Sequence, residues 1–263
     1  MHMELSLKEK VAFISGGASG IGAETARNFL SLGAKVVIGD VNKSKGQALV
    51  ETLKSSGYDN IAMQHLDVTK ESDWHASIAY TQSTFGPLTT LVNSAGVSIP
   101  GSIEDISLEE FHHTTSINLD GTFLGCKAGL AAMKQNKGGS IINIASTLGH
   151  RGGAGFAAYN ASKAGVLMLT RSIALHCAEQ KYDVRINSVS PGAIHTEMVE
   201  GYVEKGVAAG AKAEDIISQF AAPHPMGRLG RASEVASAIV FLASDSSSFS
   251  TGIDIPVDGG YLC

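Results

Sequence analysis

Residues 11–22 read VAFISGGASGIG, where a short apolar run passes directly into a turn with the spacing Gly-x-x-x-Gly-x-Gly. The helical pattern AETARNFLSLG follows at residues 23–33. Glycines let the backbone approach a ligand closely, and the start of a helix directs free N–H groups and partial positive charge at an anion. This stretch therefore predicts a site for the diphosphate of a dinucleotide, formed by Gly16, Ser19, Gly20, Ile21 and Gly22. Alternatively, the glycines only supply the positive φ angles of a tight turn.

Six further apolar runs follow, separated by segments of helical length. They are KVVIGD at 35–40, IAMQHLDV at 61–68, TTLVNSAG at 89–96, SIINIAS at 140–146, RINSVSPG at 185–192 and IDIPVDGG at 253–260. Such alternation is typical of βαβ units and predicts an α/β fold, with a doubly wound parallel sheet of about seven strands and helices on both faces. We expect one domain over residues 1–263, in which residues 198–228, mixed in Gly, Ala and Pro, form a substrate lid.

Composition excludes several classes of function. The net charge of −5 and the absence of any block of Lys or Arg argue against nucleic-acid or membrane partners. The three cysteines, Cys126, Cys177 and Cys263, show no CxxC spacing, and the nine histidines show no HExxH motif, so we expect neither disulfide nor metal. No signal peptide and no stretch of ~20 apolar residues stands out, which predicts a cytoplasmic protein.

Asp40 ends the second predicted strand, 35–40. An acidic residue there can accept hydrogen bonds from an adenosine ribose, and its charge would repel a 2′-phosphate. Gly39, Val41 and Asn42 beside it include no arginine, and Ser19 in the glycine turn is not basic, so NAD is favoured over NADP. The alternative is that Asp40 caps the next helix.

Tyr159 and Lys163 form a YxxxK pair, and Ser146 lies thirteen residues upstream at the end of the run 140–146. A tyrosine hydroxyl has an unperturbed pKa near ~10 and needs a nearby cation to exchange a proton at neutral pH. Residues four apart share one helix face, so Lys163 can lower the pKa of Tyr159. The three residues are predicted to supply the acid and base chemistry of hydride transfer, although YxxxK also occurs on solvated helices.

These motifs occur in a recognisable order. After the glycine turn come Asp67-Val68, Asn93-Ser94-Ala95-Gly96, Asn118, Ser146, Tyr159, Lys163 and Pro191-Gly192. From residue 8 to its end, the chain resembles the single-domain short-chain dehydrogenases/reductases, which implies a Rossmann-type sheet and an NAD cofactor. The usual NNAG of that family reads Asn93-Ser94-Ala95-Gly96 here. Because Asn93 and Gly96 remain, we expect altered local hydrogen bonding and not loss of cofactor binding.

The resemblance also implies roles for single residues. Asp67 and Val68 would flank the adenine, and Asn93 and Gly96 would approach the ribose and backbone. Lys163 would hold the nicotinamide ribose. Ile194 and Thr196, which follow Pro191-Gly192, would meet the nicotinamide. Asn118 would help to hold a water that links Lys163 to solvent. The alternatives are ordinary core, turn and capping roles, and for Asn118 a backbone-bonded position inside a helix. Family members commonly form tetramers, so we expect a homotetramer.

In the expected reaction, Ser146 positions the substrate oxygen and Tyr159 removes the hydroxyl proton while a hydride passes to NAD⁺. The pocket segments 97–100, 148–157 and 198–226 are mainly apolar, and residues 123–127 and 131–134 are similar to bacterial hydroxysteroid and cyclic-alcohol dehydrogenases. We therefore expect an oxidoreductase that interconverts a hydrophobic or cyclic secondary alcohol, such as a hydroxysteroid, and its ketone.

The sequence leaves open two alternative functions and the position of two histidines relative to the substrate cavity. A 3-oxoacyl or small-ketone reductase would use the same residues. A noncatalytic NAD-binding sensor would be marked by a damaged set of Asn118, Ser146, Tyr159 and Lys163, and here all four are present. His150 and His195 lie near these motifs in sequence and either line the substrate cavity or are solvated.

Overall fold

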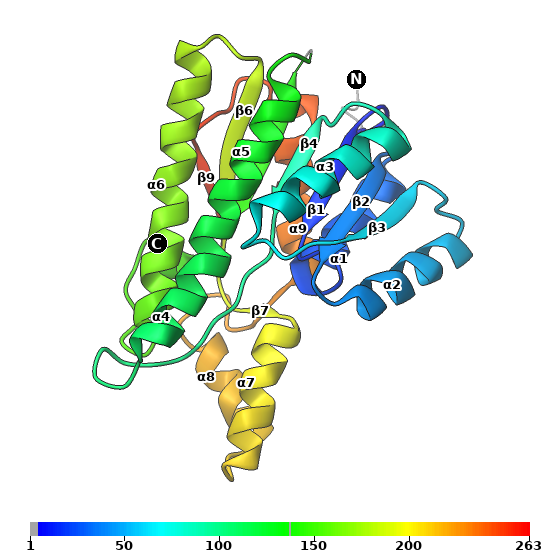
Figure 1. Cartoon of the computed structure of the whole chain (residues 1–263). Helices are drawn as coiled ribbons and strands as arrows, with labels where there is room; N and C mark the ends of the chain where they lie inside the picture. The colour runs from blue at the N-terminus through cyan, green and yellow to red at the C-terminus, as the bar shows by residue number, and fades with distance from the viewer. Residues whose placement is uncertain (1–4, 137) are drawn as a thin grey trace.

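The computed structural model describes residues 5–136 and 138–263 (Figure 1), so residues 1–4 and 137 of the predicted domain lie outside the described part. Seven parallel strands form one sheet in the order β3-β2-β1-β4-β5-β6-β9. They are β1 (Val11–Ser15), β2 (Lys35–Asp40), β3 (Ile61–His65), β4 (Thr90–Asn93), β5 (Gly139–Ile144), β6 (Val184–Pro191) and β9 (Asp254–Val257). Each predicted run overlaps one of these strands, and β5 and β6 begin one residue before their runs, which confirms the predicted doubly wound sheet.

Helices cover both faces of the sheet. They are α1 (Gly20–Ser31), α2 (Lys43–Ser55), α3 (Glu71–Phe85), α4 (Leu108–Thr115), α5 (Gly121–Met133), α6 (Ala157–Glu179) and α9 (Ala232–Ala243). Phe29 of α1 and Ile239 of α9 belong to one hydrophobic cluster, and Trp74 of α3 and Met133 of α5 belong to another. Two separate cores, one on each face, are what a doubly wound sheet requires. Among the helices of the described chain, none is both long and apolar enough to cross a membrane.

Several strands end before the predicted runs do. β3 stops at His65 and β4 at Asn93, whereas the runs extend to Val68 and Gly96. The polar and glycine residues at these ends leave the ladder and form loops at the carboxyl edge of the sheet. The strand order reverses between β1 and β4, and ligands of such sheets bind at this edge, beside that reversal.

Two further helices, α7 (Glu197–Ala208) and α8 (Ala213–Ala221), project away from the sheet, at the bottom of Figure 1. They correspond to the predicted lid at 198–228. A small parallel ladder holds both ends of this segment, because β7 (Ile194–His195) precedes α7 and pairs with β8 (Gly230–Arg231) beyond α8. This segment thus starts and ends on paired backbone beside the carboxyl edge of the main sheet.

Candidate active site

A cleft of about 880 Å³ lies at the carboxyl edge of the sheet. It is lined by residues of the loops that follow β1, β2, β3, β4, β5 and β6, and by α7 and α8. The predicted site residues that line it are Gly16, Ser19, Gly20, Ile21, Gly22, Asp40, Asp67, Val68, Gly96, Ser146, Tyr159, Lys163, Pro191, Gly192, Ile194 and Thr196. Of the predicted set, the structure leaves only Asn93 and Asn118 outside the lining.

The glycine turn needs its glycines for two reasons. Gly16 and Gly20 have φ angles of 65° and 51°, which favour glycine. A Cβ on Gly16 would also lie 2.7 Å from the backbone of Ala95, too close for any side chain. Since α1 begins at Gly20 directly after its cap residue Ser19, and both residues line the cleft, the turn presents bare backbone and a helix start to it. A dinucleotide diphosphate fits this combination.

Asp40 is held beside this turn by backbone groups. Its Oδ2 accepts a hydrogen bond from Ala18 N at 3.1 Å, and its Oδ1 accepts one from Asn42 N at 2.9 Å. The cap of α2 is Asn42, whose Oδ1 accepts a hydrogen bond from Lys45 N at 3.0 Å. The alternative role of Asp40 as a helix cap therefore does not apply, and its carboxylate stands at the cleft wall.

Asp67 and Val68 follow β3 at the same edge. The Asp67 Oδ1 accepts hydrogen bonds from the hydroxyl and the N–H of Thr69, at 2.7 and 3.1 Å. The Thr69 hydrogen bond lowers the pKa of Asp67, so the side chain is a carboxylate at neutral pH. Trp74 Nε1 donates to the carbonyl of Val68 at 2.9 Å and fixes this loop against α3.

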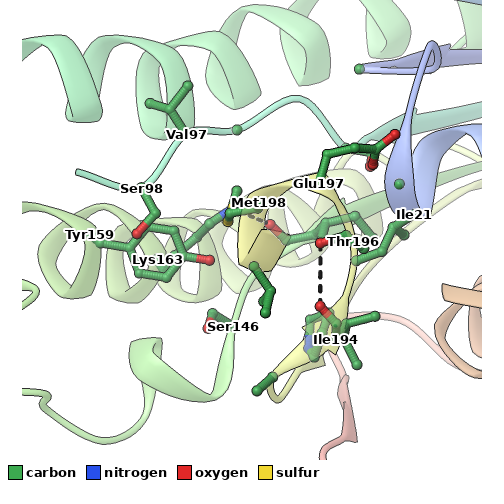
Figure 2. A pocket seen from close by; sticks show the side chains of 18 of the residues that line it. Ile21, Val97, Ser98, Ser146, Tyr159, Lys163, Ile194, Thr196, Glu197 and Met198 are labelled. Carbon is green, nitrogen blue, oxygen red and sulfur yellow. Dashed lines mark hydrogen bonds between the residues drawn. The ribbon is translucent and has the colours of Figure 1, made fainter. Parts of the chain in front are cut away.

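Ser146, Tyr159 and Lys163 converge on the same cavity (Figure 2). Tyr159 and Lys163 lie on α6, and the Lys163 Nζ is 5.7 Å from the centre of the Tyr159 ring. The lysine side chain is only 4% exposed and its Nζ donates a hydrogen bond to Ile144 O at 2.7 Å. Ser146 follows β5, and its hydroxyl accepts from Leu148 N at 3.1 Å. Backbone groups at the end of β5 and just after it thus hold the side chains of Lys163 and Ser146.

Burial sets the protonation states of this pair. It raises the pKa of Tyr159 to about 12, although the Ser146 hydroxyl opposes the rise, and it lowers the pKa of Lys163 to about 8. The expected lowering of the tyrosine pKa is therefore wrong for the cleft in this structure, because desolvation outweighs the hydrogen bond with Ser146. At neutral pH Tyr159 therefore holds its proton.

The side chain of Asn118 does not line the cleft. It lies in a π-helical turn, η1 (Ser116–Asp120), between α4 and α5. Its Oδ1 accepts from Val97 N at 2.8 Å, and its Nδ2 donates to Val97 O at 2.9 Å and to Ser162 Oγ at 3.1 Å. The backbone-bonded alternative for Asn118 is the observed arrangement. Even so, a Cβ on Gly96 would lie 3.2 Å from Asn118 Oδ1 and 3.6 Å from Lys163 Nζ, so the three residues are neighbours.

Asn93 is the second predicted residue that the structure keeps from the cleft. Its side chain points beneath α5, where its oxygen lies against Gly125. The Nδ2 donates to Asn143 Oδ1 at 2.8 Å, and Asn143 in turn donates to Thr170 Oγ1 at 2.9 Å. Because side chains alternate along β4, the Asn93 side chain faces the helical layer, and the predicted approach to the cofactor is left to its backbone.

The two histidines whose position the sequence left open lie outside the cleft lining. His150 Nε2 lies 2.9 Å from Asp254 Oδ2, and the exposed His195 lies 4.0 Å from Glu200, so neither lines the cleft. His224 does line it and is 6% exposed. Its Nε2 accepts a hydrogen bond from Ala193 N at 3.0 Å, across 31 residues. No spacing in the sequence indicated His224. In the described part of the chain, no cluster of three or more His, Cys, Asp or Glu could hold a metal.

Apolar and aromatic side chains form the outer part of the cleft. Its lining there includes Val97, Leu148, Phe156, Met198, Val199, Tyr202 and Phe220. The rings of Tyr202 and Phe220 stack with centres 5.6 Å apart, and Phe156 meets Tyr202 edge-on at 6.3 Å. The Tyr202 hydroxyl donates to Ser98 O at 3.0 Å. These contacts join α7 and α8 to the body of the protein and give the cleft an apolar wall.

Comparison with known proteins agrees with this geometry. A family model described as "Enoyl-(Acyl carrier protein) reductase" matches residues 16–262. The NADP-dependent (R)-specific alcohol dehydrogenase of Lentilactobacillus kefiri is 41% identical, and the 3-beta-hydroxysteroid dehydrogenase of Comamonas testosteroni is 40% identical, each over 97% of both chains. The 2,5-dichloro-2,5-cyclohexadiene-1,4-diol dehydrogenase LinX of Sphingobium indicum is 38% identical, also over 97% of both chains. The crystal structure of gox2181 superposes with a TM-score of 0.90 at 34% identity, covering 98% of this chain and 97% of the other.

Proposed function

The chain belongs to the short-chain dehydrogenase/reductase family, and on that basis we propose that it interconverts a hydrophobic or cyclic secondary alcohol and its ketone with NAD as the preferred cofactor. Hydroxysteroids are within this substrate class. The observation that carries the proposal is the convergence of Ser146, Tyr159 and Lys163 in one cleft. The glycine turn stands at one side of that cleft and the aromatic wall at another.

The cleft residues suit a nicotinamide dinucleotide. Backbone N–H groups at Ser19, Gly20 and Ile21 would meet the diphosphate, Asp40 the adenosine ribose, and Asp67 and Val68 the adenine. Lys163 would bind the nicotinamide ribose, and Ile194 and Thr196 would orient the nicotinamide. When bound, this group supplies the acceptor or donor of the hydride.

The preference for NAD rests on the carboxylate of Asp40. Because two backbone N–H groups fix this side chain at the cleft wall, it cannot turn away from an adenosine ribose without losing both hydrogen bonds. A 2′-phosphate there would meet a negative charge, and neither Val41 nor Asn42 offers a compensating cation. The relative from Lentilactobacillus kefiri is named as NADP-dependent, so the ratio of the two cofactors is the quantity to measure.

Proton transfer falls to Tyr159. In alcohol oxidation the tyrosine accepts the hydroxyl proton, and in ketone reduction it donates a proton to the carbonyl oxygen. Ser146 holds the substrate oxygen, and the positive charge of Lys163 favours the phenolate during oxidation. The hydrogen bond from Lys163 to Ile144 O keeps the ammonium group beside the ring. Asn118 positions Val97 and Ser162 behind this pair.

The apolar wall supports a substrate with a ring or a hydrophobic frame. The relatives named for a cyclohexadiene diol and for a hydroxysteroid point to the same class. The family description names an enoyl-(acyl carrier protein) reductase, and the acyl thioester that such an enzyme binds keeps a 3-oxoacyl or small-ketone reductase as the second candidate. Within the described lining, however, the lysines are Lys163 and Lys205 and arginine is absent, which gives a phosphate-bearing carrier little to bind.

We also propose that the protein assembles as a homotetramer in the cytoplasm. Met168 and Leu175 on α6 are 60% and 65% exposed, and Phe123 on α5 is exposed too. Exposed apolar side chains on neighbouring helices are typical of surfaces that pair with another subunit. Light scattering of the purified protein would give the mass to compare with the 27.3 kDa chain.

The test of the proposed reaction is absorbance at 340 nm. Purified protein is mixed with NAD⁺ or NADP⁺ and a panel of open-chain secondary alcohols, cyclic alcohols and hydroxysteroids, and with NADH and a 3-oxoacyl thioester in the reverse direction. We expect NADH formation with cyclic or hydrophobic alcohols, lost in Tyr159→Phe. Turnover only with the thioester would favour the second candidate. Binding of NAD without turnover of any substrate would favour the sensor alternative.

A further inference from the structure

Glu197 brings a carboxylate to the glycine turn from a distant part of the chain. It is the first residue of α7, and its Oε1 pairs with the Nζ of Lys45 on α2 at 2.9 Å. Its Oε2 faces the turn, because a Cβ on Gly20 would lie 3.5 Å from that atom. In Figure 2 the side chain extends away from Tyr159, toward the start of α1 near Ile21.

This carboxylate is ionised at neutral pH. Burial raises its pKa, but hydrogen bonds from Lys45 and from backbone groups that include Gly20 outweigh that effect, so the pKa of Glu197 lies below its usual value. The side chain is 50% exposed, which means that water partly screens its charge. Glu197 is therefore a partly screened anion that its ion pair with Lys45 holds at the turn.

The start of α1 lacks an anion of its own. Ser19 is the cap residue and makes no side-chain capping hydrogen bond, and the first turn of this described helix contains no Asp or Glu. A helix start carries partial positive charge and free N–H groups, which favour an anion. In this structure the anion is Glu197. Under the proposed function the same helix start would meet the cofactor's diphosphate.

A second cavity beside Glu197 can accept its carboxylate. Glu197 borders both the large cleft and a second cavity of about 380 Å³, which is lined by Lys45 and Arg27 among others. A side chain that leaves Gly20 can therefore keep its ion pair with Lys45 on the side of the second cavity.

From these contacts we propose that Glu197 competes with the diphosphate of the cofactor for the start of α1, and that Lys45 holds the carboxylate when the diphosphate binds. The inference rests on the proposed function. It makes Glu197 and Lys45 a pair that sets cofactor affinity without touching the reacting atoms. Since α7 begins at Glu197, cofactor binding and the first turn of the lid are linked through one side chain.

The test is the binding of NADH and of ADP-ribose, followed by calorimetry, to the wild type, Glu197→Gln and Glu200→Gln. Because two anions at one helix end repel each other through partly screened contacts, we expect Glu197→Gln to lower both dissociation constants about three- to tenfold. The difference should shrink in high salt. Glu200 lies on the same helix and is similarly exposed, but does not line the cleft, so Glu200→Gln should match the wild type. Unchanged or weaker binding by Glu197→Gln would overturn the proposal.

Lys45→Met tests the second half of the proposal. Without the positive charge of Lys45, Glu197 should compete more strongly with the diphosphate for the start of α1. The dissociation constants of NADH and ADP-ribose should therefore rise several-fold. In the Glu197→Gln background the same substitution should have a clearly smaller effect. Equal effects in both backgrounds would mean that Lys45 attracts the diphosphate directly, and would overturn its role as a holder. If the wild type bound neither ligand, the proposed function itself would fail, whereas wild-type binding with an unaltered Glu197→Gln contradicts this inference alone.

Discussion

The Nε2 of His224 accepts a hydrogen bond from the backbone N–H of Ala193 at 3.0 Å, which ties the end of the lid segment to the turn after β6. The ring also packs on Gly192, where a Cβ would lie 2.5 Å from Nε2, and next to the ring of Tyr261 at 5.1 Å. One buried imidazole thus joins three segments that line the cleft. Because Nε2 accepts, the ring in this arrangement is neutral.

His224→Ala should disturb the turn that carries Ile194 and Thr196. Loss of one buried hydrogen bond is worth about 1–2 kcal/mol, so we expect kcat/KM to fall about tenfold, with much of the change in KM for the cofactor. Steady-state kinetics with varied cofactor would show this. His224→Gln, whose amide oxygen can accept from Ala193 N, should recover part of the loss. Equal losses in both variants, with equal thermal unfolding, would contradict a role in positioning.

Tyr159→Phe should abolish turnover and leave cofactor binding nearly intact. Removing a general acid or base costs on the order of 10²–10⁴-fold, and the phenyl ring keeps the packing of the tyrosine. The measurement combines the 340 nm assay with an NADH titration. Tyr80→Phe on α3, which does not line the cleft, is the matched control. Turnover by Tyr159→Phe close to that of the control would rule out Tyr159 as the proton carrier.

Alcohol oxidation should accelerate as pH rises. The reaction needs the phenolate of Tyr159, and burial raises the pKa of this residue to about 12, so the phenolate fraction grows about tenfold per pH unit below that value. A nearby positive charge moves the midpoint to lower pH but keeps the sign of the slope. Ketone reduction uses the protonated tyrosine and should change little near neutral pH. Profiles of kcat/KM in both directions would check this, and an oxidation rate that fell with rising pH below about 8, where Lys163 is still charged, would contradict it.

Lys163→Met should lose activity but unfold less readily at neutral pH. Burial lowers the pKa of Lys163 from 10.5 to about 8, so its contribution to stability is present above pH 10.5 and is lost as pH falls through about 8. Methionine removes the cost of charging a buried amine but also the hydrogen bond to Ile144 O. We expect a net gain of about 1 kcal/mol in the free energy of unfolding. Urea unfolding at neutral and at high pH should show the gain only at the lower pH.

Asp40→Asn should reduce the preference for NAD over NADP about tenfold or more. The amide keeps the shape of the carboxylate and one oxygen that can accept from Ala18 N, while the charge that would repel a 2′-phosphate is lost. The ratio of kcat/KM for the two cofactors is the quantity to compare. Asp67→Asn, another carboxylate of the cleft, serves as the control. An unchanged ratio would show that Asp40 does not select the cofactor.

Local patterns in the sequence were sufficient to predict the strands, the glycine turn and the proximity of Tyr159 to Lys163. The seven apolar runs predicted the strands, because each needs only a short stretch of side chains that suits a buried strand. The turn at residues 16–22 was readable because glycine spacing and the following helix lie in one continuous segment. Tyr159 and Lys163 were predicted to be neighbours for the same reason, since a separation of four residues on a helix fixes their proximity.

Tertiary structure decided what local spacing cannot encode. Asn93 faces α5 and not the cleft, because the orientation of β4 in the sheet determines which side its last side chain occupies. Burial reversed the expected pKa change of Tyr159, since desolvation depends on everything packed around the ring. Lys45 meets Glu197 across 152 residues, and His224 meets Ala193 across 31. Such contacts arise only when distant segments of the chain are packed together. The sequence by itself therefore determined the strands and the proximity of Tyr159 to Lys163, and the packing decided their environment.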